Sequence, residues 1–136
     1  MLFRSDLVTV VGGRPAMLRD SVILGSVDSI GDAGFRGVNP RTAVGIANGG
    51  KRLFIAVIDG RQAGYSAGMS LREMVTLLRD MGAHDAINLD GGGSSAMVLR
   101  DAKEAGRVTI VNKPSDAVGE RPVANALAVT GVCGVR

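Results

Sequence analysis

The stretch that decides the fold is RLFIAVID at residues 52–59, which is followed by a helical pattern at residues 70–82 and by DAINLD at residues 85–90. Residues 52–59 combine β-branched, aromatic and other apolar side chains at successive positions, which predicts a strand buried on both faces in the middle of a sheet. A strand, a helix and a strand at this spacing predict a parallel pair joined by a right-handed crossover. The sequence therefore indicates an α+β fold with a mixed sheet, a βαβ crossover unit and one main amphipathic helix.

The helix between these strands has clear signals at both ends. Ser70 is a predicted N-cap and Glu73 follows three residues later, which is the pattern of a capping box. Apolar side chains then recur with the 3.6-residue period, and Gly82 is a typical stop. We interpret the methionines of this segment as core packing rather than as ligands of a cofactor.

Further strands are expected on both sides of this unit. Residues 41–47 and 52–59 flank Asn48-Gly49-Gly50, which predicts a hairpin. Upstream, residues 6–11, 16–18 and 21–24 read as strands around a turn at residues 12–15, residues 25–40 read as a loop, and the chain opens as though its N-terminal portion were missing. Downstream, residues 94–99, 107–111 and 122–130 are predicted strands. Without an internal repeat or linker, residues 1–136 are predicted to form a single domain.

Composition excludes several classes of function. The chain has 136 residues, of which 46% are hydrophobic and 21% charged, as expected for one compact domain. The net charge of +3 is scattered, and with 3% aromatic residues and no Trp the chain is not expected to bind nucleic acid. No apolar run approaches the about 20 residues of a membrane span, and no signal peptide is apparent. Cys133 is the only cysteine, which excludes an intrachain disulfide.

Two carboxylates are predicted at one edge of the sheet. Asp59-Gly60 and Asp90-Gly91 each end a strand, and open α/β sheets bind ligands at the edge where such strands end. Gly91, Gly92 and Gly93 would let backbone N–H groups approach an anion such as phosphate, and the hydroxyls of Ser94 and Ser95 follow at once. The alternative interpretation is a tight turn in which the two serines satisfy the backbone.

A second polar cluster lies near the C-terminus of the sequence. Asp116, Glu120, Arg121 and Asn125 surround prolines and a glycine just before the apolar residues 122–130. An Asn inside a buried strand needs hydrogen-bond partners, and a ligand is one candidate. The alternative is an ionic network that fixes a loop. Arg41, followed by Thr42, is ambiguous in the same way, since an Arg fork binds phosphate and carboxylate equally well.

These motifs together resemble those of the phosphodiester glycosidase domain family. The residues that carry the resemblance follow the family's order from Pro40 to Val129. They are Pro40-Arg41-Thr42-Ala43-Val44-Gly45, Asp59-Gly60-Arg61, the helix at residues 70–82, Asn88-Leu89-Asp90-Gly91-Gly92-Gly93-Ser94-Ser95 and Gly119-Glu120-Arg121-Pro122-Val123-Ala124-Asn125-Ala126-Leu127. The asparagine- and glycine-rich opening strand that is usual in this family is missing.

The resemblance implies hydrolysis of a sugar 1-phosphodiester, such as one of N-acetylglucosamine, at its glycosidic carbon. Arg41, Arg121 and the amides of residues 91–93 would then hold the phosphate. A carboxylate would stabilise the oxocarbenium-like centre or activate water, with Asp90 the first candidate and Glu120 and Asp59 the next. The other predicted substrate-binding residues are Thr42, Asn88, Ser94, Ser95, Asp116 and Asn125.

Two other functions remain open at this stage. A phosphoglycan-binding module would use the same residues without turnover, and a metal-dependent phosphodiesterase would cut the phosphorus–oxygen bond. No cofactor is evidently required, although carboxylates could ligate a divalent cation and the metal question stays open. The expected partner is a phosphorylated glycan or sugar phosphodiester, and the resemblance suggests a location outside the cytoplasm.

Overall fold

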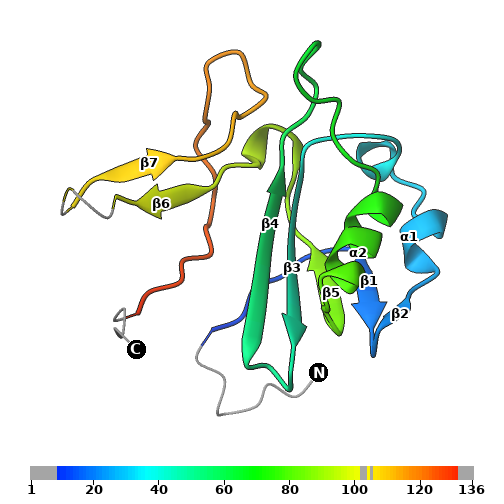
Figure 1. The fold of residues 1–136 in the computed structure, drawn as a ribbon. Coiled ribbons are helices and arrows are strands. Elements are labelled where there is room, and N and C mark those ends of the chain that lie inside the picture. Colours follow the sequence, from blue (N-terminus) through cyan, green and yellow to red (C-terminus); the bar gives the residue numbers. More distant parts are fainter. Residues whose placement is uncertain (1–8, 102–103, 105, 132–136) are drawn as a thin grey trace.

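The computed structural model describes residues 9–101, 104 and 106–131, which form two antiparallel sheets and one main helix (Figure 1). The larger sheet has the strand order β2-β1-β5-β3-β4, and the smaller pairs β6 with β7. In chain order, the elements are β1 (Ala16–Arg19), β2 (Val22–Ile23), α1 (Ser26–Ser29), a 3-10 turn (Ala33–Phe35), β3 (Arg41–Ala47), β4 (Arg52–Ile58), α2 (Leu71–Asp80), β5 (Asp85–Asn88), a second 3-10 turn (Gly92–Ser94), β6 (Val98–Arg100) and β7 (Val108–Ile110). The predicted α+β class is therefore confirmed.

The predicted mixed sheet with a parallel βαβ pair is wrong in its pairing. β3 lies between β4 and β5 and is antiparallel to both, with Arg41 opposite Ile58 and Ala43 opposite Asn88. β4 and β5 consequently run in the same direction and are connected through α2, but they are not hydrogen-bonded neighbours. The reason is the tight turn between β3 and β4, which places β3 beside β4 and leaves the other edge of β3 for β5. All ladders in the described part of the chain are antiparallel.

The position of β4 also differs from the prediction. The apolar side chains on both of its faces predicted a central strand, but β4 is an edge strand of the larger sheet as far as the described residues extend. Helix α2 packs against β1, β3 and β5 on one face of the sheet, and no described helix covers the opposite face (Figure 1). On the other face Leu53 and Ile55 of β4 and Ile46 of β3 are exposed.

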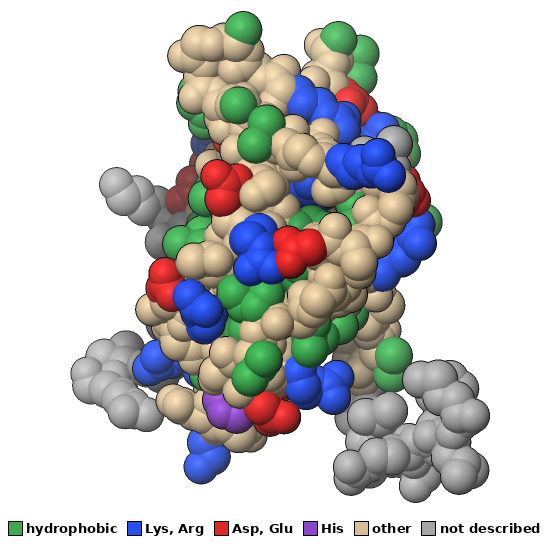
Figure 2. Space-filling view, turned by 90° about the vertical axis from the view of Figure 1, so that its right-hand side faces the viewer, with side chains coloured by type: hydrophobic (Ala, Val, Ile, Leu, Met, Phe, Trp, Pro, Cys, Tyr) green, Lys and Arg blue, Asp and Glu red, His purple; other side chains and the backbone are tan. Residues whose placement is uncertain are grey.

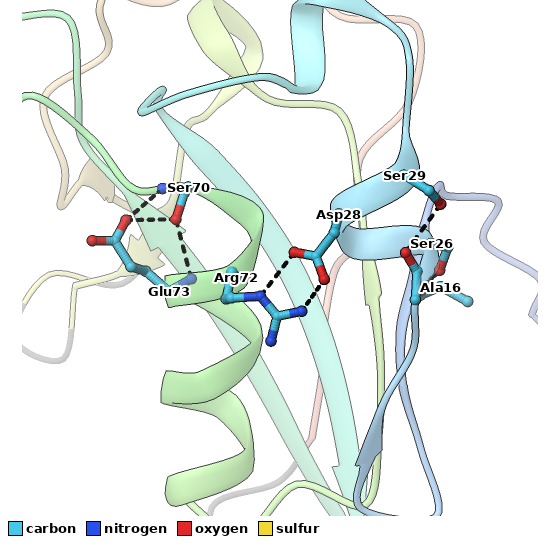
Figure 3. Close-up of polar contacts among 8 residues, drawn as sticks. Ala16, Ser26, Asp28, Ser29, Ser70, Arg72 and Glu73 are labelled. Atoms are coloured by element: carbon cyan, nitrogen blue, oxygen red, sulfur yellow. Dashed lines mark hydrogen bonds and ion pairs between the residues drawn. The ribbon is translucent and has the colours of Figure 1, made fainter.

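The helix forms as its sequence signals predict. Ser70 Oγ accepts from the backbone N–H of Glu73 at 3.2 Å, and the Glu73 carboxylate accepts from the Ser70 N–H at 2.8 Å, which is a complete capping box (Figure 3). The hydrogen bonds from Ser70 lower the pKa of Glu73. The buried side of α2 supplies Leu71, Met74, Val75 and Leu78 to the core, where they meet Met17 and Leu18 of β1.

An ion pair joins the two helices on the outside of this core. The guanidinium of Arg72 in α2 binds the carboxylate of Asp28 in α1 through two nitrogens (Figure 3). On this side of the molecule, basic, acidic and hydrophobic groups are interspersed (Figure 2). Among the described residues, no helix has the length and apolar character needed to cross a membrane.

The remaining predicted elements have mixed outcomes. The strands at 16–18, 21–24, 41–47 and 107–111 are confirmed in position, whereas the loop at 25–40 contains α1 and a 3-10 turn. The strand predicted at 94–99 begins only at Val98. Residues 9–11 of the strand predicted at 6–11 are not a strand; its other residues, like Cys133, lie outside the described part. The strand predicted at 122–130 is also wrong: these residues pair with no described strand, and Asn125 is exposed rather than buried.

Candidate functional site

The ends of β4 and β5 meet at the start of β3, and this edge of the sheet holds the candidate site. The backbone N–H of Leu89 donates to the Thr42 carbonyl at 2.9 Å, so the chain beyond β5 still follows β3. One residue after β4 lies Asp59, and two residues after β5 lies Asp90. Because β4 and β5 run in the same direction, both carboxylates emerge at the same edge, as the sequence indicates.

A cleft of about 620 Å³ opens at this edge, and we call it the arginine cleft. Four arginines line it but only two aspartates, so the charged side chains give it an excess of positive charge. Such a surface attracts an anionic ligand. Its lining residues are Gly12, Gly13, Arg14, Asp32, Gly34, Phe35, Arg41, Arg61, Asn88, Leu89, Asp90, Gly91, Gly92, Gly93 and Arg121.

The three successive glycines form a bend in which most amides are already used. The N–H of Gly91 donates to the Asp90 carboxylate at 2.9 Å, and the N–H of Gly92 donates to the Pro40 carbonyl at 3.0 Å. Only the N–H of Gly93 has no hydrogen bond with a described residue. The alternative of a tight turn therefore explains two of the three amides, and the anion-binding role predicted for the Gly93 N–H remains a prediction.

Close packing explains why this bend needs glycine. Gly92 has φ +60°, a left-handed conformation that glycine adopts without strain. A Cβ on Gly93 would overlap the carboxylate of Asp116. Asp116 therefore approaches the bend closely, although it comes from a segment more than 20 residues further along the chain.

Arg41 is buried, and its guanidinium is largely occupied by backbone carbonyls. Its Nε donates to Met69 O at 3.0 Å, and its Nη2 donates to Phe35 O and Gly37 O at 3.0 and 2.9 Å. Burial, and secondarily the positive charge of Arg61, lowers the pKa of Arg41. The phosphate-binding role predicted for Arg41 remains a prediction, and only its Nη1 makes no hydrogen bond with a described residue.

Arg61 lines the cleft although its sequence context predicted no role for it. Asn39 Oδ1 accepts from its Nε and Nη2 at 3.1 and 2.9 Å, while its Nη1 lies 3.1 Å from where a Cβ on Gly92 would stand. Its φ of +57° is rare for a residue with a side chain, and such strain concentrates at functional sites. The available signal was its place just after Asp59-Gly60, at the end of a strand.

Arg121 connects the second polar cluster to the glycine bend. Its Nη2 donates to Ser94 Oγ at 2.8 Å, and its Nη1 lies 3.4 Å from the Asp116 carboxylate. The two clusters that the sequence singled out therefore meet in space. Thr42 donates to Ser95 Oγ at 3.2 Å, and Ser95 is buried, so this pair lies below the cleft lining.

The three predicted catalytic carboxylates have different surroundings. Asp90 is exposed and lines the arginine cleft, with Oδ1 accepting from Gly91 N–H. Glu120 is exposed outside the cleft lining and makes no hydrogen bond or ion pair with a described residue. Asn125 is likewise outside the lining. Their predicted roles remain predictions, and geometry favours Asp90 among the carboxylates.

Asp59 holds two loops together. Its carboxylate accepts from Asn112 Nδ2 at 2.9 Å, from Lys113 N–H at 3.0 Å and from the Tyr65 hydroxyl at 2.9 Å. Burial alone would raise the pKa of Asp59, but these hydrogen bonds and the charge of Lys113 together lower it. In return, the Asp59 carboxylate raises the pKa of Tyr65. This arrangement fits a positioning residue, since both carboxylate oxygens are occupied.

Asn88 is a buried residue among the predicted binding residues. Its Nδ2 donates to the carbonyls of Arg14 and Leu89, both at 2.8 Å, which fixes the orientation of the amide. Its Oδ1 is buried and accepts no hydrogen bond from a described residue. The described residues contain no group of three or more His, Cys, Asp or Glu side chains placed to hold a metal ion.

Comparison with known proteins identifies the family. The sequence model of the phosphodiester glycosidase family matches residues 3–130. The chain belongs to the phosphodiester glycosidase family. The resemblance carried by the motifs between Pro40 and Val129 is thus confirmed. A search of curated proteins finds no match.

Three solved structures that are similar to this family member are longer proteins. A Burkholderia pseudomallei protein, provisionally described as exported, is 46% identical over 62% of this chain and 14% of its own, with a TM-score of 0.52. A hypothetical protein from Synechocystis is 26% identical over 62% of this chain and 16% of its own, with a TM-score of 0.51. The third is the zebrafish N-acetylglucosamine-1-phosphodiester alpha-N-acetylglucosaminidase catalytic domain, auto-inhibited by pro-peptide. It is 26% identical over 78% of this chain and 35% of its own, with a TM-score of 0.58. This chain therefore spans about a third or less of each of them.

Proposed function

We propose that the arginine cleft binds a sugar 1-phosphodiester and that the chain hydrolyses its glycosidic bond. One observation carries the proposal: in a member of the phosphodiester glycosidase family, the guanidinium of Arg61 lies against the glycine bend in the cleft that Asp90 and Arg121 also line. The zebrafish relative is named for this chemistry on an N-acetylglucosamine 1-phosphodiester. We extend that substrate class to this chain.

The phosphate is best placed at Arg61 and the glycine bend. Arg61 points Nη1 toward Gly92, Gly93 has an unused N–H, and Arg121 reaches the bend from the opposite segment. Arginine forks and backbone N–H groups are the usual ligands of phosphate oxygens. A phosphate monoester is already a weakly basic leaving group, so neutralising its negative charge matters more than donating a proton to it.

Asp90 is the carboxylate best placed to act on water. Its Oδ1 is held by Gly91 N–H, while Oδ2 makes no hydrogen bond with a described residue. In the proposed step, the water oxygen bonds to the anomeric carbon as the bond from that carbon to the phosphate oxygen breaks. Asp90 accepts a proton from the water, and the bonding electron pair leaves with the phosphate. The products are the free sugar and a phosphomonoester.

Hydrolysis in isotopically labelled water tests the proposal. With the methyl diester of α-N-acetylglucosamine 1-phosphate, we expect the label in the sugar, and we expect Asp90→Asn to lower kcat at least about 100-fold. Label in the phosphate would instead show phosphorus–oxygen cleavage. Saturable binding without turnover would show a phosphoglycan-binding module.

Two subsidiary proposals accompany this function. We expect hydrolysis to survive treatment with a chelator, and a loss that added divalent cation restores would contradict this expectation. We also propose a location outside the cytoplasm, which the provisional description of the Burkholderia relative supports. Fractionation of cells that produce the natural full-length protein tests it.

A further inference from the structure

A second, open hollow on the surface shares Arg61 with the arginine cleft. It has a volume of about 590 Å³ and is lined by Val38 and residues 61–67, and we call it the loop hollow. Arg61 lines both cavities. Apart from Arg61, the lining of the loop hollow includes no charged residue. Its apolar surface comes from Val38, Ala63, Tyr65 and Ala67.

The loop that forms this hollow has a defined conformation of its own. Arg61 N–H donates to Ala67 O at 3.2 Å, and Gln62 N–H donates to Ser66 O at 2.9 Å, so the two ends of the loop pair with each other. Gln62 Nε2 also donates to Lys113 O at 2.8 Å, which ties the loop to the neighbouring segment. A hollow fixed by such hydrogen bonds is largely preformed, as ligand sites usually are.

Tyr65 is placed to contact a ligand in this hollow. Its hydroxyl is anchored on Asp59 and Lys113 Nζ lies 4.9 Å from its ring centroid, yet 59% of the residue remains exposed. It is the only tyrosine of the chain. A ring that is held at its edge but open to solvent loses little conformational freedom when it packs against an apolar surface.

We propose that the loop hollow is the subsite for the alcohol half of the phosphodiester and that Tyr65 packs against a cyclic group carried by that alcohol. The inference rests on the proposed function, because it takes the phosphate to lie at Arg61. A diester has one organic group on each side of its phosphate. With the phosphate at the residue shared by both cavities, the sugar occupies the arginine cleft and the alcohol enters the loop hollow. Its apolar lining selects a ring with a C–H face over a charged chain.

Two diesters that differ only in the alcohol test this subsite. The methyl and cyclohexylmethyl diesters of α-N-acetylglucosamine 1-phosphate share the sugar and the phosphate, so the ratio of their KM values isolates the hollow. We expect wild-type protein to favour the cyclohexylmethyl diester roughly three- to tenfold, the range that one aromatic contact provides. Tyr65→Ala should bring the ratio to about one.

The matched control is Tyr65→Phe, which keeps the ring and removes the hydrogen bond to Asp59. It should retain the wild-type ratio. A purely structural role of Tyr65 would raise both KM values together in both variants and leave the ratio unchanged, which would overturn the proposal. A wild-type ratio of one would also overturn it.

Failure of the proposed function gives a different result. If the wild-type protein hydrolyses neither diester, the same two compounds are compared by calorimetric binding. A preference for the cyclohexylmethyl diester that Tyr65→Ala abolishes would still support the loop hollow as a subsite. Equal affinities for the two diesters would overturn it.

Discussion

Replacing Asp59 with Asn should destabilise the fold rather than only slow a chemical step. The carboxylate accepts hydrogen bonds from Asn112, Lys113 and Tyr65, all at 2.9–3.0 Å. An amide in its place keeps one acceptor oxygen and turns an NH₂ group toward at least one of these donors. Hydrogen bonds to a charged group contribute about 1.5–3 kcal/mol, so losing about one of them lowers the free energy of unfolding by about 2 kcal/mol. For a domain of this size, that is a fall in Tm of about 6–10 °C.

The pH dependence of this effect has a defined sign. The pKa of Asp59 in the folded protein lies below its ordinary value of 3.8. Its contribution to stability is therefore complete above pH 3.8 and is lost as the pH falls through the lower, folded-state pKa. Urea unfolding of the wild type and of Asp59→Asn should differ at neutral pH, and the difference should shrink below pH 3.8.

Asp80→Asn is the matched control, because Asp80 is exposed and its contact with Arg79 is long, at 3.4 Å. This control should change stability by less than about 0.5 kcal/mol. The reasoning is refuted if Asp59→Asn unfolds like Asp80→Asn. Loss of kcat in Asp59→Asn without any loss of stability would instead support the catalytic role predicted from the sequence.

Three further predictions concern the cleft and the helix. Asn39→Ala removes the acceptor that holds Arg61 Nε and Nη2, so it should raise KM for the methyl diester roughly three- to tenfold. Steady-state kinetics would measure this change, and calorimetry should show little change in Tm. An unchanged KM would argue against Arg61 as a phosphate ligand. Gly93→Ala forces a methyl group into the Asp116 carboxylate and should lower the free energy of unfolding, measured in urea, by about 1–3 kcal/mol. Gly12→Ala is the control, because a Cβ there meets nothing within 4 Å, and it should leave this free energy nearly unchanged. Ser70→Ala removes the N-cap of α2 and should lower the free energy of unfolding by about 1 kcal/mol. An unchanged free energy of unfolding would contradict the capping argument.

Elements with local signals could be predicted closely from the sequence. The capping pair Ser70 and Glu73 and the stop at Gly82 place the ends of α2 without reference to the rest of the chain. The β3–β4 hairpin likewise depends on residues that are adjacent in sequence. In both cases the hydrogen bonds that decide the structure lie within a few residues of each other.

Which strands become neighbours could not be predicted in this way. An apolar strand such as residues 52–58 has the same composition at the centre or at the edge of a sheet, and only the pairing of β3 with both β4 and β5 decides its place. Residues 122–130 show the same difficulty. Their pattern suits a strand, but a strand also needs a partner, and the described part of the chain provides none for them.

The edge of the sheet that holds the candidate site could be predicted, but the contacts of its individual side chains could not. Strand direction predicts the edge where Asp59 and Asp90 emerge. The sequence does not reveal that the fork of Arg41 is occupied by carbonyls 4 to 28 residues away, or that Arg61 takes the position beside Gly92. The burial of a guanidinium depends on the path of the surrounding loops, which a single sequence does not fix.

The outer side of β4, which pairs with no strand of the described part of the chain, has a practical consequence for work with this protein. Its seven residues contain no proline and only one charge, Arg52, so little opposes the approach of a foreign strand to its free amides and carbonyls. We expect concentrated samples to associate through this edge of β4. Light scattering would detect the association before any turbidity appears. Ile55→Lys, at a position that faces solvent, should keep the protein in solution longer without disturbing the opposite, helix-covered face of the sheet.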